Sequence, residues 1–231
     1  MLPRAILFDW DNTLVDSWAC IHGAYNATLA WAGLPPRSLE ETRSSVRLSL
    51  RDSFPELFGA RWQEARDVYY AEFEARHLDM LAPLPGAGDL LDLLSARGIY
   101  LGVVSNKTGR FLRAEAAALG WDRYFGRLVG ATDAAADKPS VEPVEMALAP
   151  LGIGPGPDVW FVGDADVDMR CAHAAGCIPV LVGKSLDVFE HFPPAHRYEN
   201  CFILSNLVRR LGDTILQESS APTAVAGPGT E

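Results

Sequence analysis

The stretch Ala5-Ile-Leu-Phe-Asp9-Trp-Asp11-Asn-Thr-Leu-Val-Asp16 decides the fold. Its apolar part has the length of a strand and ends in two carboxylates, Asp9 and Asp11, two positions apart. In an extended segment these side chains point to the same side, so their charges repel each other unless a cation lies near them. Hard divalent cations prefer carboxylate and carbonyl oxygens. The stretch therefore favours a metal site at the end of a buried strand, with a solvated acidic turn as the alternative.

Apolar segments and helical segments alternate along the rest of the chain. Apolar runs of strand length lie at residues 100–104, 128–129, 159–162, 178–182 and, more weakly, 201–204. Segments with helical apolar spacing, each followed by a glycine, lie at residues 89–97, 109–119, 143–151 and 166–175. Most of the apolar runs are continuous, as in a parallel sheet that is covered on both faces. The pattern predicts an α/β fold with a doubly wound parallel sheet.

The interval between the first strand and residue 100 is helical throughout. Large apolar side chains recur at helical spacing over residues 17–32, about 39–53 and about 61–79. We therefore predict a helical insert within an α/β core, followed by a flexible tail that is rich in Ser, Ala, Pro and Gly. The predicted ranges are 1–15 and 85–217 for the core, 16–84 for the insert and 218–231 for the tail.

Polar side chains follow three of the predicted strands. In chain order they are Asp9, Asp11, Ser105, Asn106, Asp164 and, one helical turn later, Asp168. Because ligands bind beyond the carboxyl ends of strands in open α/β sheets, we expect these side chains to meet at one edge. Helix capping is the alternative for Asp168, and an ordinary turn serine is the alternative for Ser105. Gly163, directly before Asp164, suggests a close approach to the backbone.

The opening stretch resembles the first motif of the haloacid dehalogenase superfamily, Asp-x-Asp-Gly-Thr-Leu-x-Asp-Ser, with Asn12 in the place of glycine. Asparagine tolerates a left-handed backbone, so the tight turn can form. Three further segments resemble the later motifs in order: Val103-Val-Ser-Asn-Lys107, Asp137-Lys-Pro139 and Gly163-Asp-Ala-Asp-Val-Asp168. The layout is similar to the phosphoglycolate-phosphatase-like members, which carry a helical cap after the first motif.

The resemblance implies a phosphatase that hydrolyses a small phosphate monoester through an aspartyl phosphate, with Mg²⁺ as cofactor. It implies that Asp9 is the nucleophile, that Asp11 is the general acid and base, and that Lys138 contacts the nucleophile and the phosphate. The phosphate-binding residues that we expect are Ser105, Asn106 and Lys138. The expected metal ligands are Asp9, Asp11 (through its backbone carbonyl), Asp164 and Asp168.

The composition restricts the partners. A formal net charge of −10, from 20 basic and 30 acidic residues, argues against nucleic acid, because phosphate backbones are bound by clustered Lys and Arg. A small phosphorylated metabolite remains, since a metal ion, a lysine and backbone amides suffice to hold it. The chain lacks an apolar run that approaches the roughly 18 residues of a membrane span. Without a signal peptide or Cys-x-x-Cys pairs, we expect a cytoplasmic protein that does not interact with membranes.

Other functions fit part of the pattern. A sugar-phosphate mutase would use the same core but release little phosphate. A phospho-accepting receiver gathers the same residue types, but such domains are too short for the insert, and an inactive binding relative would not need all the catalytic side chains. Contacts to the leaving group are expected from the insert, with His22, Tyr25, Arg47 and Arg51 as candidates and a solvated or packed helix face as the alternative for each.

Overall fold

The main body of the protein is a six-stranded parallel sheet in the order β5-β4-β1-β6-β7-β8. The computed structural model describes residues 2–46, 48–184 and 189–219. The strands are β1 (Ala5–Phe8), β4 (Tyr100–Thr108), β5 (Arg127–Ala131), β6 (Val159–Gly163), β7 (Ile178–Val182) and β8 (His196–Tyr198). β1 lies inside the sheet, where Phe8 is opposite both Val103 of β4 and Val162 of β6. The predicted α/β fold with a parallel sheet is confirmed.

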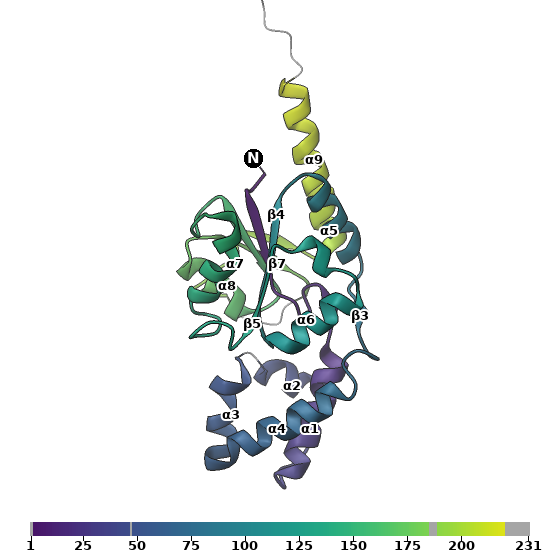
Figure 1. Cartoon of the computed structure of the whole chain (residues 1–231), viewed down its shortest axis with the longest axis vertical. Coiled ribbons are helices and arrows are strands. Elements are labelled where there is room, and N and C mark those ends of the chain that lie inside the picture. Colours follow the sequence, from purple (N-terminus) through teal and green to yellow (C-terminus); the bar gives the residue numbers. More distant parts are fainter. Residues whose placement is uncertain (1, 47, 185–188, 220–231) are drawn as a thin grey trace, which may run out of the picture.

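Helices cover both faces of this sheet (Figure 1). On one face, α5 (Ala87–Ala96), α6 (Gly109–Ala118) and α9 (Cys201–Ser219) share a core with Ile6 and Phe8. On the other face, α7 (Glu142–Leu148) and α8 (Asp166–Ala174) share a core with Ala5 and Leu7. Because successive residues of a strand point to opposite faces and both faces are covered, β1 is apolar at every position.

A helical lobe lies below the sheet in Figure 1, between β2 (Val15–Asp16) and β3 (Ala82–Pro83). Its helices are α1 (Trp18–Trp31), α2 (Leu39–Ser45), α3 (Leu50–Phe58) and α4 (Trp62–Glu74), and all lie within the predicted insert. The lobe has a core of its own, which Phe111 of α6 joins. β2 and β3 pair antiparallel, so the chain enters and leaves the lobe at adjacent points.

Two expectations about local structure were wrong. The helical segment predicted at 39–53 is two helices, α2 and α3. The weak strand predicted at 201–204 is the first turn of α9, and the edge strand is β8. The side chains of Cys201 and Leu204 are buried at helical spacing, and Asn200 caps the helix by accepting from the amide of Ile203 at 3.1 Å.

Short 3-10 turns complete the described structure at Gly59–Arg61, Asp122–Tyr124 and Ala149–Leu151. Of the predicted tail, residues 220–231 lie outside the described residues, and residues 218 and 219 belong to α9. Among the described residues, no helix has the length and apolar character of a membrane span.

Candidate active site

A pocket lies between the carboxyl ends of β1, β4 and β6 and the helical lobe. Its sheet side is lined by the predicted site residues Asp9, Asp11, Ser105, Asn106, Lys138 and Asp164. Its lobe side is lined mainly by apolar and aromatic side chains, among them Trp18, Ile21, Tyr69, Tyr70 and Phe73. Segments far apart in the sequence therefore bring the predicted residues into one pocket, as expected for an edge where parallel strands end.

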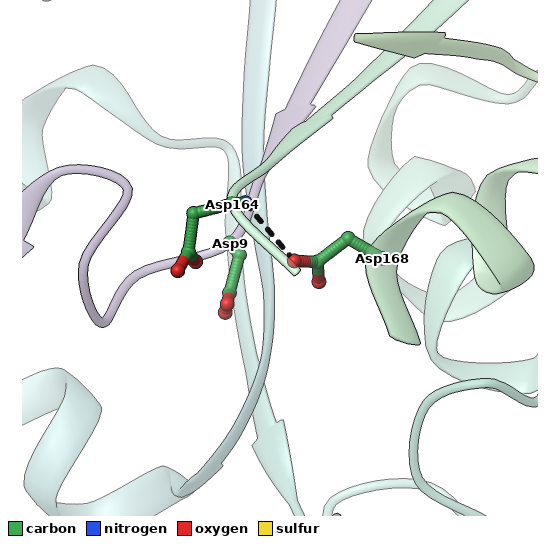
Figure 2. A group of neighbouring side chains, drawn as sticks. All are labelled: Asp9, Asp164 and Asp168. Atoms are coloured by element: carbon green, nitrogen blue, oxygen red, sulfur yellow. Dashed lines mark hydrogen bonds between the residues drawn. The ribbon is translucent and has the colours of Figure 1, made fainter. Parts of the chain in front are cut away.

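Three carboxylates form a compact cluster, of which Asp9 and Asp164 line the pocket and Asp168 is buried behind them. Asp9, Asp164 and Asp168 each offer an oxygen, and these oxygens lie within 4.8 Å of one another. Figure 2 shows the carboxyl groups of Asp9 and Asp164 pointing the same way, with Asp168 approaching from α8. Such a set of hard oxygen donors fits a divalent cation such as Mg²⁺.

The pKa values of the clustered carboxylates also favour a divalent cation at this place. Burial raises the pKa of the Asp9 carboxyl to about 6, although the ammonium of Lys138 opposes the shift. Burial, together with the charges of Asp168 and Asp9, holds the pKa of Asp164 well above its usual range. The carboxylates therefore lie in an environment where negative charge is poorly compensated, and a divalent cation would relieve it.

Lys138 binds two of these carboxylates. Its Nζ lies 2.8 Å from Oδ1 of Asp9 and 2.7 Å from Oδ1 of Asp168, and its side chain is 1% exposed. Burial lowers the pKa of Lys138, but the charges of Asp168 and Asp9 outweigh burial and raise it. The side chain of Asn106 holds the backbone of Lys138: its amide donates to the carbonyl at 3.2 Å, and its Oδ1 accepts from the amide at 3.0 Å. The Asn106 amide, expected at the phosphate, is thus engaged in holding the Lys138 loop.

Asp168 has both carboxylate oxygens engaged. Oδ1 accepts from Lys138, and Oδ2 accepts from the amides of Asp164 at 3.1 Å and Ala165 at 3.0 Å. The capping alternative therefore holds, and Asp168 also binds Lys138, while its predicted role as a metal ligand stays a prediction. A Cβ atom on Gly163 would lie 2.3 Å from Cγ of Asp168, so the expected close approach exists and requires glycine.

The turn after β1 aims Asp9 at the pocket. Asn12 has φ of +62°, so it adopts the left-handed conformation anticipated for the residue that replaces glycine. Oδ1 of Asp9 accepts from the Trp10 amide at 2.7 Å, and Oδ1 of Asp164 accepts from the Thr13 hydroxyl at 3.1 Å. Within the described part of the chain, Oδ2 of Asp9 and Oδ2 of Asp164 have no hydrogen-bond partner. These two oxygens are available to a ligand.

Asp11 lies at the pocket but outside the cluster of three carboxylates. Its Oδ1 accepts from the hydroxyl of Ser17 and lies 2.7 Å from Nζ of Lys107. Lys107 was not among the predicted site residues, and neither was Glu115, whose Oε2 lies 2.6 Å from the same Nζ. The sequence does indicate that Glu115 is buried, because this residue falls on the apolar face of α6, four residues after Phe111.

Ser105 and Lys107 belong to β4, which continues beyond Val104, where we ended the strand, to Thr108. The register shifts between Val104 and Thr108. The Ser105 hydroxyl accepts from the Lys107 amide at 3.2 Å and lines the pocket. The polar residues are therefore part of the strand itself rather than of the loop that follows it.

The candidates for leaving-group contacts do not line the pocket where the structure describes them. His22 Nδ1 lies 2.9 Å from the Thr42 hydroxyl, and the Tyr25 hydroxyl accepts from Arg37 at 3.1 Å. Arg51 forms an ion pair with Asp137 at 2.8 Å, which links α3 to the loop before Lys138. The fourth candidate, Arg47, lies outside the described residues.

Comparisons with known proteins agree with this arrangement. A family model described as haloacid dehalogenase-like hydrolase matches residues 6–182. A phosphoglycolate phosphatase of Xylella fastidiosa is 33% identical over 184 residues, with 78% of this chain and 80% of that relative covered. A phosphoglycolate phosphatase of Rhodospirillum rubrum is 34% identical over 193 residues, with 78% of this chain and 79% of that relative covered.

Solved structures share the fold. A HAD-superfamily hydrolase from Ehrlichia chaffeensis matches with a TM-score of 0.63 and 31% identity, covering 91% of this chain and 98% of that one. A haloacid dehalogenase-like family protein from Streptococcus pneumoniae matches with a TM-score of 0.78, covering 91% of this chain and 98% of that one. At 22% identity, the second match is a likeness of fold alone.

Proposed function

The chain belongs to the haloacid dehalogenase-like hydrolase family and is a phosphatase, and from this premise we propose that it hydrolyses a small phosphate monoester with Mg²⁺ through a phosphorylated Asp9. The observation that carries the proposal is the state of the Asp9 carboxylate. One oxygen is held by Lys138 and the Trp10 amide, and the other has no hydrogen bond within the described residues and belongs to a side chain that lines the pocket. This is the arrangement of an oriented nucleophile.

In the first step, Oδ2 of Asp9 attacks the phosphorus atom, and the bond from phosphorus to the leaving oxygen breaks. Asp11 donates a proton to that oxygen, so the product leaves as an alcohol. The Lys138 ammonium and the Ser105 hydroxyl stabilise the negative charge on the equatorial phosphoryl oxygens. The enzyme then carries a phosphate ester on Asp9.

In the second step, Asp11, now ionised, takes a proton from a water molecule. The water oxygen attacks phosphorus, the bond to Asp9 breaks, and inorganic phosphate is released. Asp11 ends the cycle protonated, as it began. The step therefore needs one side chain that gives a proton and takes it back, and Asp11 is the acid nearest the nucleophile in the sequence.

The residues proposed to hold Mg²⁺ are Asp9, Asp164 and the backbone carbonyl of Asp11, with Asp168 orienting Lys138 and the turn around Asp164. When bound, the ion neutralises charge between the carboxylates and the phosphoryl group. The fit rests on the cluster of hard oxygen donors and on the available oxygens of Asp9 and Asp164.

The test is phosphate release from a panel of monoesters, with and without Mg²⁺. Phosphoglycolate comes first, because the two relatives bear that name, followed by sugar phosphates and nucleotides. We expect Asp9→Asn to lower turnover by at least about 10⁴-fold and to retain the circular dichroism spectrum of the wild type. Asp67→Asn, at an exposed carboxylate, serves as the control. Near-normal turnover of Asp9→Asn would refute the proposal, and a sugar-phosphate isomer formed without free phosphate would indicate a mutase.

A further inference from the structure

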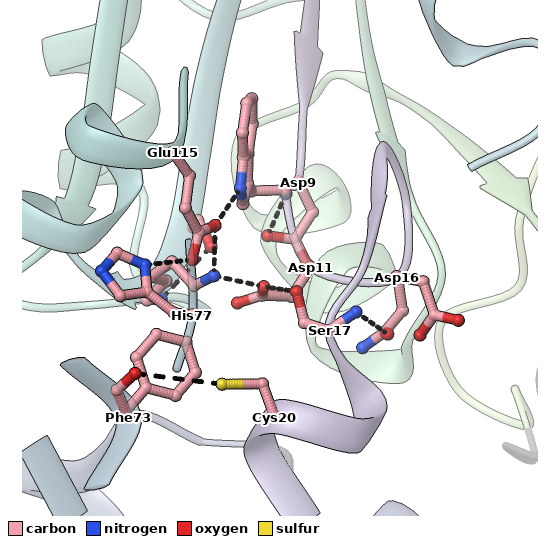
Figure 3. Close-up of polar contacts among 12 residues, drawn as sticks. Asp9, Asp11, Asp16, Ser17, Cys20, Phe73, His77 and Glu115 are labelled. Atoms are coloured by element: carbon pink, nitrogen blue, oxygen red, sulfur yellow. Dashed lines mark hydrogen bonds and ion pairs between the residues drawn. The ribbon is translucent and has the colours of Figure 1, made fainter. Parts of the chain in front are cut away.

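A second buried polar cluster lies beside Asp11, outside the three-carboxylate cluster (Figure 3). We call it the Lys107 cluster; its members are Trp10, His77, Lys107 and Glu115. Nζ of Lys107 lies 2.7 Å from Oδ1 of Asp11 and 2.6 Å from Oε2 of Glu115. The cluster joins the turn after β1, strand β4, helix α6 and the chain that leaves the helical lobe.

Glu115 is the centre of this cluster, and both of its carboxylate oxygens are hydrogen bonded. Because a carboxylate only accepts, the surrounding groups are the donors: Trp10 Nε1 donates to Oε2 at 2.7 Å, and His77 Nδ1 donates to Oε1 at 2.8 Å. The side chain of Glu115 is 2% exposed, and that of Lys107 is 3% exposed. Neither side chain has a role in the mechanism above.

Stability alone does not account for these buried charges. Removing two ions from water is unfavourable, and apolar side chains of similar volume would commonly stabilise a core as well or better. The surroundings are apolar: the Lys107 ammonium lies 4.9 Å from the ring centroid of Phe73, and His77 stacks on the same ring at 5.2 Å. The buried pair of Lys107 and Glu115 therefore indicates a function, which depends on the group that Lys107 binds.

What Lys107 holds is one oxygen of Asp11. Oδ1 accepts from Lys107 and from the hydroxyl of Ser17, while Oδ2 has no hydrogen bond within the described residues. Asp11 lines the pocket, with a side chain that is 17% exposed. Two donors on one oxygen fix the orientation of the carboxylate and leave the other oxygen for proton exchange. Proton transfer requires such fixed geometry, because the acid must lie within hydrogen-bond reach of the leaving oxygen.

We propose that Lys107, held in place by Glu115, is a positioning residue that orients Asp11 for proton transfer. The proposal rests on the proposed function, because it assigns Lys107 a task in that reaction. Glu115 acts one step further away: it fixes the Lys107 ammonium and, through Trp10, the backbone between Asp9 and Asp11.

The first experiment compares Lys107→Met with the wild type on an alkyl phosphate, whose leaving group needs a proton. We expect kcat to fall about 100-fold, the lower end of what general acid–base catalysis contributes, and KM to change less than about threefold. In an Asp11→Asn background, the same substitution should lower kcat by less than about threefold, because the group that Lys107 orients is already lost. Equal losses in both backgrounds would overturn the proposal.

A second readout uses p-nitrophenyl phosphate, whose phenolate leaves without protonation. Phosphorylation of Asp9 should then stay fast in Lys107→Met, while the later step, which needs Asp11 as a base, should be slow. We expect a burst of p-nitrophenol equal to the enzyme concentration, followed by slow turnover. A folded variant that is slow and lacks the burst would assign Lys107 to the nucleophile or the phosphate instead, and would also overturn the proposal.

Loss of fold is controlled by two further variants. Lys107→Met/Glu115→Gln removes both charges of the buried pair and should fold like the wild type, yet keep the low kcat of Lys107→Met. Lys107→Arg keeps the positive charge and should recover at least about a tenth of wild-type kcat. Wild-type kcat in the folded double variant would refute the positioning role. If Asp9→Asn abolishes phosphate release while Lys107→Met keeps the wild-type kcat, only this inference fails and the proposed function stands.

Discussion

Two buried lysines lie beside the same pocket, and each binds two carboxylates. Lys138 bridges Asp9 and Asp168 at 2.8 and 2.7 Å, and Lys107 bridges Asp11 and Glu115 at 2.7 and 2.6 Å. The chain has three lysines in all, so two of the three are at this site. The local geometry is nearly the same, but the surroundings differ.

Negative charge exceeds positive charge around Lys138, because the carboxylate of Asp164 lies in the same cluster. Around Lys107, an indole, an imidazole and an aromatic ring complete the enclosure, and both oxygens of Glu115 are hydrogen bonded. The first centre has carboxylate oxygens that are available to a ligand, whereas the second reaches the pocket through Lys107 and the Asp11 carboxylate that Lys107 binds. The difference teaches that a buried ion pair next to an active site can bind a ligand or can orient a neighbouring side chain. Carboxylate oxygens without a hydrogen bond indicate the first role, and a carboxylate with both oxygens hydrogen bonded indicates the second.

Among the predictions that compare the two lysines, the largest expected effect is that of Lys138→Met. Under the proposed mechanism the Lys138 ammonium stabilises phosphoryl charge, so its loss should lower kcat/KM by about 10³-fold. The burst with p-nitrophenyl phosphate should disappear, because phosphorylation itself would be slowed. Steady-state and burst kinetics measure both quantities, and the exposed Lys184, changed to Met, is the control. A smaller loss for Lys138→Met than for Lys107→Met would reverse the roles assigned to the two lysines.

The next effect concerns the stability of the Lys107 cluster. Glu115→Ala leaves the buried Lys107 ammonium without its partner in the core, so we expect the free energy of unfolding to fall by about 3–5 kcal/mol. Glu74→Ala removes an exposed ion pair to Arg110 and should change stability by less than about 1 kcal/mol. Denaturant titrations of the two variants make the comparison. Similar losses of unfolding free energy in the two variants would mean that the Lys107–Glu115 pair contributes no more to stability than an exposed ion pair.

The smallest effect is a pH dependence of the three-carboxylate cluster. The pKa of Asp9 is raised from 3.8 to about 6, so the folded state favours the neutral carboxyl. That stabilisation is fully present below pH 3.8 and is lost as the pH rises through about 6. Without metal, we therefore expect Asp9→Asn to melt about 3–6 °C above the wild type at about pH 7.5 and close to it at about pH 4.5.

Thermal melts at both pH values, repeated with Mg²⁺, check this prediction. The ion should raise the Tm of the wild type at about pH 7.5 and narrow the gap to Asp9→Asn, since binding to the folded state is stabilising. A variant that melts below the metal-free wild type at this pH would show that the Asp9 charge is well compensated by Lys138 alone.

Much of the Lys138 centre could be predicted from the sequence. Asp9 and Asp164 directly follow or end apolar runs, and the carboxyl ends of parallel strands meet at one edge. Gly163 also indicated a close approach, which proved to be that of Asp168. These signals are local in the sequence, because each residue is placed by the strand that it follows.

The Lys107 centre could not be predicted in the same way. Lys107 lies two residues beyond Ser105, and only the continuation of β4 places it inside the site. Glu115 lies on the buried face of α6, but its partners come from three other segments of the chain. Pairing that depends on tertiary packing has no local pattern, although a Glu on an apolar helical face is a warning that a buried partner exists.

The pairing of β2 with β3 has a consequence for how this architecture can change. Val15 lies opposite Pro83, so the entry and exit of the helical lobe are neighbours. Topologically, the lobe is one very long hairpin loop. Recombination could exchange it for another module without altering strand order, because the chain would still return at the same place. The lobe side of the pocket can thus be replaced while the sheet side stays unchanged.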